Sequence, residues 1–131
     1  MELNEYQRLA RRTNNIDTPS GMIENGVLGM CGEAGECADI LKKYFFQGHD
    51  LDRNAMLEEV GDVLWYIALT ASGLGVTLEE VAQKNLTKLK VRYPEGFDPE
   101  RSVNRPEYAD SRKHQIDTGF PHLFCTRNKM I

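Results

Sequence analysis

Gly32-Glu33-Ala34-Gly35-Glu36, echoed by Glu58-Glu59-Val60-Gly61-Asp62, is the stretch that decides how this chain folds. Both stretches lie in segments whose apolar spacing predicts helix, and helical geometry puts two acids of each segment on a single stripe. Such a stripe normally carries the apolar residues that face neighbouring helices in a bundle. Small or apolar residues flank the acids on each stripe, so the sequence predicts carboxylates that face one another between two helices. The four acids are Glu33, Glu36, Glu59 and Asp62.

Four facing carboxylates would repel one another unless a cation lies between them or some of them are protonated. Oxygen ligands without a nearby histidine suit a hard divalent cation, Mg²⁺ with Mn²⁺ as the alternative, rather than zinc or iron. The competing interpretation is that these acids lie on solvated helix surfaces, as most acidic residues do. We favour the metal site because two acidic pairs each replace the apolar step of their own stripe.

The two motifs, G-E-x-G-E on one helix and E-E-x-x-D-x-x-x-Y on the next, resemble those of the MazG-type all-α nucleoside triphosphate pyrophosphohydrolases. The resemblance covers roughly residues 1–97 and implies that Mg²⁺ is held by the four acids named above. It also implies cleavage of the α–β phosphate bond of a nucleotide, which gives a monophosphate and pyrophosphate. A later basic segment lies where that family has its own, with Lys88 and Arg92-Tyr93-Pro94.

The chemistry that this resemblance implies gives roles to individual residues. Attack by water on the α-phosphorus needs a group that orients the water, and Glu33 and Glu36 are the candidate catalytic residues, which the sequence does not separate. A lysine near the polyphosphate would neutralise charge that the metal leaves uncovered. Asn25 either caps its helix or contacts substrate, and the sequence leaves both uses open. The candidate substrate-binding residues are Asn25, Tyr66, Asn85, Lys88 and Arg92.

Apolar periodicity and capping signals predict four helices. The third is apolar around much of its circumference, which favours a central place for it. Thr77 and Glu80 form a capping box at the start of the fourth, and Pro94 ends it. The predicted fold is all-α, a four-helix antiparallel bundle of the all-α NTP pyrophosphatase type with an irregular C-terminal tail. The helices are predicted over residues 3–13, from between 20 and 25 to about 45, from about 52 to 72, and from 78 to about 93.

Four glycines inside the second predicted helix need a structural reason, because each costs about 1 kcal/mol relative to alanine. Close approach of another backbone, or of a ligand, supplies such a reason. The glycines are Gly26, Gly29, Gly32 and Gly35.

Two further features have both a structural and a functional interpretation. Trp65 points away from the acidic stripe, and a lone tryptophan there is more often a core or subunit contact than a platform for a base. Three arginines near the N-terminus could bind phosphate, but charged residues are usually exposed, which favours a solvated helix face. These arginines are Arg8, Arg11 and Arg12.

The last part of the chain differs in composition from the rest, with prolines and few periodic apolar residues. We therefore expect a helical catalytic domain over residues 1–97 and a C-terminal extension over residues 98–131. The extension should be mostly loop, packing on the bundle or on a neighbouring subunit, with room for a short helix near residues 106–115.

The composition of the chain limits the binding partners and the cellular compartment that we expect for it. A net charge of −4 provides no general basic field, so we expect no DNA or RNA polymer as partner. No apolar run approaches the ~20 residues needed to span a bilayer, and the N-terminus lacks the regions of a signal peptide. Three cysteines without a C-x-x-C pair suit a reducing compartment. We therefore expect a cytoplasmic protein without a membrane partner, and the family resemblance implies a homodimer or homotetramer.

Two alternative functions remain open. One is a phosphoribosyl-ATP pyrophosphohydrolase, which uses similar acids on a nucleotide that bears a second sugar phosphate. The other is a non-catalytic helical interaction module whose acids face solvent or a basic partner. The preference for base and sugar is not readable, because pocket shape and a few hydrogen bonds decide it.

Overall fold

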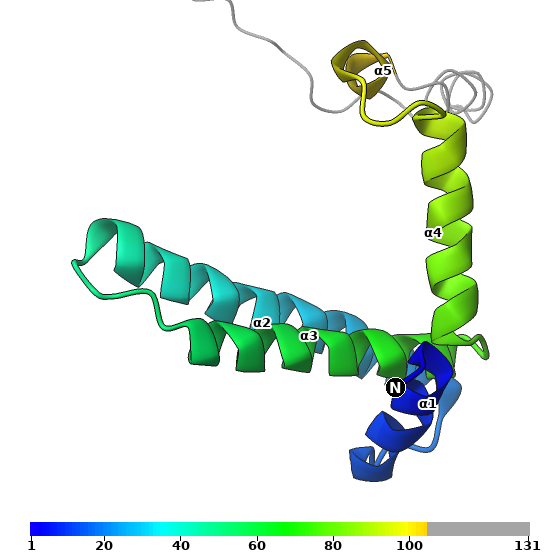
Figure 1. Cartoon of the computed structure of the whole chain (residues 1–131). Helices are drawn as coiled ribbons and strands as arrows, with labels where there is room; N and C mark the ends of the chain where they lie inside the picture. Colours follow the sequence, from blue (N-terminus) through cyan, green and yellow to red (C-terminus); the bar gives the residue numbers. More distant parts are fainter. Residues whose placement is uncertain (105–131) are drawn as a thin grey trace, which may run out of the picture. The chain divides into compact units, whose positions relative to one another are not determined.

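The computed structural model describes residues 1–104 as a series of helices joined by short connections, without a strand among them (Figure 1). The all-α class and the four longer helices predicted from the sequence are confirmed. Within residues 1–104, no single helix is long and apolar enough to cross a membrane; only α3 and α4 taken together, as a bent pair, meet that test. The elements are α1 (Leu3–Ala10), the 3-10 helix η1 (Arg11–Thr13), α2 (Pro19–Phe46), α3 (Arg53–Gly73), α4 (Leu78–Arg92) and α5 (Pro99–Val103).

The chain forms two compact units, Met1–Asn85 and a second unit that begins at Leu86. In the first unit α2 and α3 lie side by side as an antiparallel hairpin (Figure 1). A Cβ atom at Gly26 would meet Thr70, whereas one at Gly29 would meet the ring of Tyr66. Residue numbers therefore rise along α2 while they fall along α3, and this register decides which side chains of the two helices meet.

Polar side chains close the starts of the long helices. Thr18 caps α2 by accepting a hydrogen bond from the Gly21 N–H at 3.2 Å, and Pro19 occupies the first helical position, where its missing N–H has no cost. Asp52 caps α3 by accepting from two backbone N–H groups at 3.1 and 3.0 Å. The predicted capping box of α4 is confirmed, because the Glu80 carboxylate accepts from the backbone N–H and hydroxyl of Thr77.

Gln7 anchors α1 to the turn between α3 and α4. Its buried side-chain amide donates to the Ser72 hydroxyl at 3.1 Å and to the Val76 carbonyl at 3.0 Å. Its side-chain oxygen accepts from the Leu78 N–H at 2.8 Å, which satisfies an otherwise orphaned donor at the start of α4. All hydrogen-bonding groups of this side chain therefore serve the fold.

Trp65 holds the other end of α1. Its indole N–H is directed at the Ala10 carbonyl, 3.1 Å away, and at the Thr13 hydroxyl, 2.9 Å away. The structural interpretation of this tryptophan is therefore correct. The first unit also has a small buried core with partly buried apolar residues packed around it; the core residues are Ala68, Ala71 and Leu78.

The described part of the second unit, residues 86–104, contains the end of α4 and the short helix α5. Asp98 caps α5 by accepting from the backbone N–H groups of the second and third helical residues, and Pro99 occupies its first position. These capping signals explain a helix of 5 residues in a stretch expected to be mostly loop. The helix expected near residues 106–115 lies outside the described residues, and the predicted domain boundary after residue 97 stays a prediction.

Candidate metal centre

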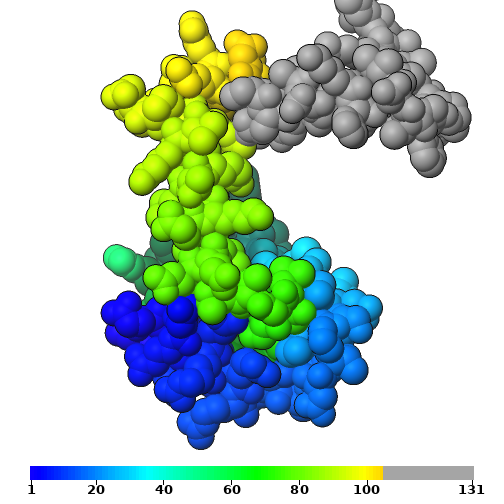
Figure 2. Space-filling model, turned by 90° about the vertical axis from the view of Figure 1, so that its right-hand side faces the viewer, coloured from blue at the N-terminus to red at the C-terminus, as the bar shows by residue number. Residues whose placement is uncertain are grey.

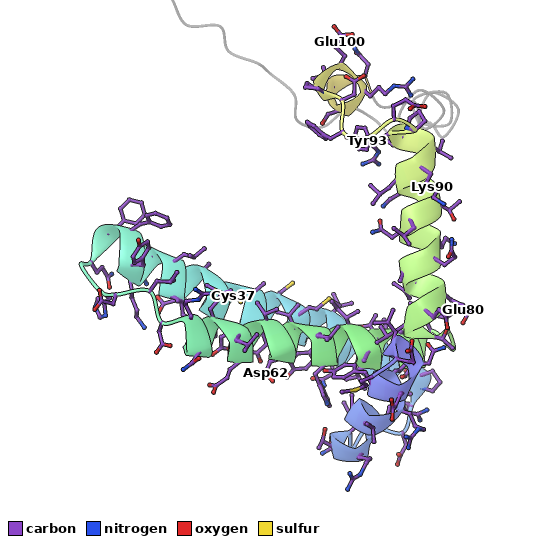
Figure 3. All side chains as sticks on the ribbon, in the orientation of Figure 1. Cys37, Asp62, Glu80, Lys90, Tyr93 and Glu100 are labelled. Atoms are coloured by element: carbon purple, nitrogen blue, oxygen red, sulfur yellow. The ribbon has the colours of Figure 1, made fainter. Side chains whose placement is uncertain are left out.

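Three of the four predicted acids lie together in the α2/α3 hairpin. One carboxylate oxygen each from Glu33, Glu59 and Asp62 lies within 4.8 Å of the other two. The hairpin register explains the meeting: Glu33 is one turn beyond Gly29, whose partner on α3 is Tyr66, and Asp62 is one turn before Tyr66. Figure 3 labels Asp62 on α3. The prediction that acids of two helices face one another is confirmed for these three.

The negative charges of the three clustered carboxylates repel one another. Glu33 and Glu59 are half-buried, whereas Asp62 is exposed. The pKa of the Glu59 carboxyl is raised above its usual value, first by partial burial and then by surrounding negative charges. Within residues 1–104 no lysine or arginine forms an ion pair with these acids, so a cation from outside the chain would relieve the repulsion. The surrounding charges belong to Glu33, Glu36 and Asp62.

Glu36 is exposed and lies outside the three-oxygen cluster. It is still within electrostatic reach, because its charge contributes to the raised pKa of Glu59 and also to the raised pKa of Lys43. The main cause of the Lys43 shift is its hydrogen bond to Asp39, with which it forms an ion pair at 2.6 Å. Glu36 therefore lies beside the cluster, and its role as ligand or catalytic residue stays a prediction.

The donor set suits the proposed type of metal. Each of the three residues offers a carboxylate oxygen, and the group contains neither a nitrogen nor a sulfur donor. Hard divalent cations with a preference for oxygen, Mg²⁺ and Mn²⁺, match such a set, whereas zinc and iron sites in proteins usually include histidine or cysteine.

The candidate substrate-binding residues are distributed over both units. Asn25 lies well inside α2, whose cap is Thr18, so the capping interpretation of Asn25 is wrong; its side chain is half-buried. Asn85 is exposed and ends the first unit. Lys88 and Arg92 belong to the second unit, and their relation to the acids stays a prediction.

Tyr66 is the candidate that the structure places nearest to the acids along the chain, one turn beyond Asp62. It is half-buried, and its ring lies against Gly29 on α2. Trp65 packs edge-on against it, with ring centroids 4.9 Å apart and an interplanar angle of 89°. The ring is therefore held in place by both neighbours, and its contact with substrate stays a prediction.

Tyr6 is a neighbour of the acids that the sequence interpretation missed. Its pKa is raised, first by burial and then by the negative charge of Asp62, so the phenol of α1 lies within electrostatic reach of the acidic cluster. The available signal was a hydroxyl on the apolar stripe of the first helix, where it accompanies Leu3 and Ala10.

Comparison with known proteins identifies the family of the chain. The model of the MazG nucleotide pyrophosphohydrolase domain matches residues 23–97, more than half of the chain, and the chain belongs to this family. It is also 40% identical over 82 residues to the Gene 37 protein of Mycobacterium phage L5, which covers 60% of this chain and 72% of that protein. No solved structure gave a significant match. The family supports a nucleotide pyrophosphohydrolase whose substrate is a small-molecule nucleotide.

Proposed function

We propose that this protein is a Mg²⁺-dependent nucleoside triphosphate pyrophosphohydrolase that releases a nucleoside monophosphate and pyrophosphate. The observation that carries the proposal is the cluster of Glu33, Glu59 and Asp62, whose oxygens lie within 4.8 Å of one another in a chain of the MazG family. Mn²⁺ is the alternative ion, because the same oxygen donors suit it.

In this proposal Glu33, Glu59 and Asp62 hold the metal and Glu36 completes the acidic site. The bound ion would supply charge stabilisation to the phosphate oxygens. Glu36 or Glu33 orients a water molecule and accepts its proton while the water oxygen bonds to the α-phosphorus. The bond from the α-phosphorus to the bridging oxygen breaks in line with the attack, and pyrophosphate leaves.

The remaining candidates bind the nucleotide in this proposal. Tyr66 lines the pocket beside the acids, and Asn25, whose side chain is not used as a helix cap, contacts substrate. Lys88 neutralises polyphosphate charge, with Asn85 and Arg92 as further contacts on the same helix.

The proposal includes a homodimer or a tetramer made of dimers. Its support is an exposed apolar face along the α2/α3 hairpin, since large apolar residues at helical spacing on a surface mark a contact between chains. Leu28 and Leu57 are 72% and 71% exposed. Light scattering that finds only monomer at working concentration would remove this part of the proposal. Further exposed members of the hairpin are Val27, Leu41, Phe45, Val60 and Leu64.

The decisive experiment compares Glu59→Gln with Glu58→Gln. Both variants lose one negative charge from neighbouring positions of α3, but only Glu59 belongs to the cluster, and Glu58 is exposed. Release of pyrophosphate and monophosphate is measured with Mg²⁺ over a panel of nucleoside triphosphates, with phosphoribosyl-ATP included. We expect Glu59→Gln to lower turnover by orders of magnitude, because a metal's charge stabilisation is worth several kcal/mol, and Glu58→Gln to retain activity.

Thermal unfolding supplies a readout that does not depend on turnover. Added Mg²⁺ should raise the Tm of the parent and of Glu58→Gln by mass action, and that of Glu59→Gln much less. Equal responses of all three proteins would exclude the metal site. A parent that responds to Mg²⁺ but releases no pyrophosphate from any nucleotide would instead favour the interaction module.

A further inference from the structure

A second polar face of the molecule lies on α1 and includes none of the residues assigned to the metal site. Five residues recur at the spacing i, i+3, i+4, i+7 and i+8, which places them on one side of α1 and η1. Together with Thr77 they line an open cavity of about 530 Å³. Figure 2 shows this region of the surface, with the residues of α1 in blue against the green residues at the start of α4. The five residues are Asn4, Gln7, Arg8, Arg11 and Arg12.

The three neutral residues of the cavity are already engaged in hydrogen bonds. Gln7 uses its amide and its oxygen to anchor α1. Asn4 donates to the Glu79 carboxylate at 2.9 Å, and Thr77 donates to the Glu80 carboxylate at 2.8 Å. These contacts also hold the two nearest acids of α4. Neither of these acids lines the cavity.

The backbone at the start of α4 is engaged as well. The N–H group of Leu78 donates to Gln7, that of Glu79 donates to Asn4 at 3.2 Å, and that of Glu80 donates to Thr77 at 3.1 Å. The helix terminus therefore has none of these donors left for a ligand. A ligand in the cavity would have to be recognised by the arginine side chains.

The three guanidinium groups are the unused donors. Arg8, Arg11 and Arg12 are exposed, and within residues 1–104 none of them forms an ion pair or a hydrogen bond through its side chain. Each guanidinium carries five N–H donors in a planar fork that matches the oxygens of a phosphate group. Three unpaired cations around one cavity create a local positive field in a chain whose net charge is −4.

The backbone that carries these arginines is fixed at both ends. Gln7 ties α1 to the turn before α4, and Trp65 is directed at Ala10 and Thr13 on either side of Arg11 and Arg12. Binding an anion therefore requires ordering of the arginine side chains only, which limits the entropic cost.

We propose that this cavity binds the diphosphate group of a small anionic ligand, as free pyrophosphate or as part of a nucleotide, without a divalent metal. The volume is in the range of small-molecule sites, and the negative charge of the whole chain disfavours a nucleic-acid polymer. None of the lining residues belongs to the proposed metal site, so the binding does not depend on the proposed function.

The test is calorimetric titration of the full chain with pyrophosphate, in the presence of EDTA and about 0.15 M salt, which screens loose surface charge. The variant carries Arg8→Gln, Arg11→Gln and Arg12→Gln. A control with the same change of charge carries Lys42→Gln, Arg53→Gln and Lys90→Gln, which do not line the cavity. We expect the arginine variant to bind about tenfold more weakly or worse, and the control to bind like the parent.

Further titrations distinguish the two possible ligands and test whether the anion binds at the arginine cavity. A nucleoside triphosphate that binds more tightly than pyrophosphate would identify a nucleotide as the natural ligand, and equal binding would identify the free diphosphate. Equal affinity in the parent and the arginine variant would overturn the proposal, as would loss in Lys88→Ala alone, because the anion would then belong to the catalytic site. Tighter binding of a single-stranded oligonucleotide would overturn the small-molecule ligand. Should the triple glutamine variant not fold, the single variants Arg8→Gln, Arg11→Gln and Arg12→Gln decide the question, and affinity unchanged in all three would again overturn the proposal.

Discussion

The two halves of the α2/α3 hairpin are packed in opposite ways. In the half near α1, Gly26 and Gly29 let α2 approach the backbone and the aromatic ring of α3, and buried residues lie beside them. Farther along α2 toward the hairpin loop, a Cβ at Gly32 or Gly35 would meet nothing within 4 Å. The same type of residue on one helix therefore permits a close helix contact at one end and leaves an open surface at the other.

The close contacts at Gly26 and Gly29 hold the two helices together, whereas the positions of Gly32 and Gly35 are open. Glu33 lies one turn beyond Gly29, the last glycine of α2 whose Cβ would meet α3, so the acids follow directly on the close contacts along the hairpin. The expectation that the glycines of α2 permit close approach is confirmed for Gly26 and Gly29. Gly32 and Gly35 carry the cost of helical glycine without a contact within the described residues, which fits an approaching ligand or second copy.

The largest effect should follow from Gly26→Ala, which breaks the close half. The new Cβ would lie 3.1 Å from the backbone N of Thr70 and from the carbonyl oxygen of Tyr66, and it would collide with the Thr70 hydroxyl. Because backbone atoms cannot move aside easily, we expect the free energy of unfolding to fall by about 1–3 kcal/mol. Chemical denaturation measures it; unchanged stability would show that the helices are not in this close contact.

Gly32→Ala should have the opposite sign and a smaller size. Nothing lies within 4 Å of the new Cβ, so the methyl group meets open space. We expect the free energy of unfolding of the metal-free protein to rise by about 0.4–1 kcal/mol, because alanine reduces the freedom of the unfolded chain. A fall would show that another part of the protein or a second copy already covers this surface. A stabilised variant with lower turnover would place substrate there.

The smallest effect concerns the pH dependence of the metal-free protein. The raised pKa of Glu59 means that the folded state binds this proton more tightly than the unfolded state does. Protonated Glu59 therefore contributes to the stability of the folded state. This contribution is fully present below the ordinary glutamate pKa and is lost as the pH rises through the raised pKa of Glu59. Glu59→Gln should therefore have the higher Tm at neutral pH, with a difference that shrinks on acidification. A difference independent of pH would show that neither burial nor the neighbouring carboxylates raise the pKa of Glu59.

Much of the fold was available from local chemistry. The acidic stripes, the Thr77–Glu80 capping box and the approximate bounds of four helices follow from spacing and capping, which depend on residues a few positions apart. The start of α2 was predicted between residues 20 and 25, one or more residues too late, because Thr18 caps the helix and Pro19 is its first residue.

The sequence by itself determined that two helices each carry a pair of acids on a stripe, and that oxygen ligands suit a hard cation. Only the tertiary structure decided which acids meet, because the register between α2 and α3 is a property of their packing and not of either helix. That register gathers Glu33, Glu59 and Asp62 and leaves Glu36 beside them. The tertiary structure also decided that Arg8 of α1 and Arg11 and Arg12 of η1 line one cavity. This depends on how Gln7 and Trp65 connect this part of the chain to residues more than 50 positions away.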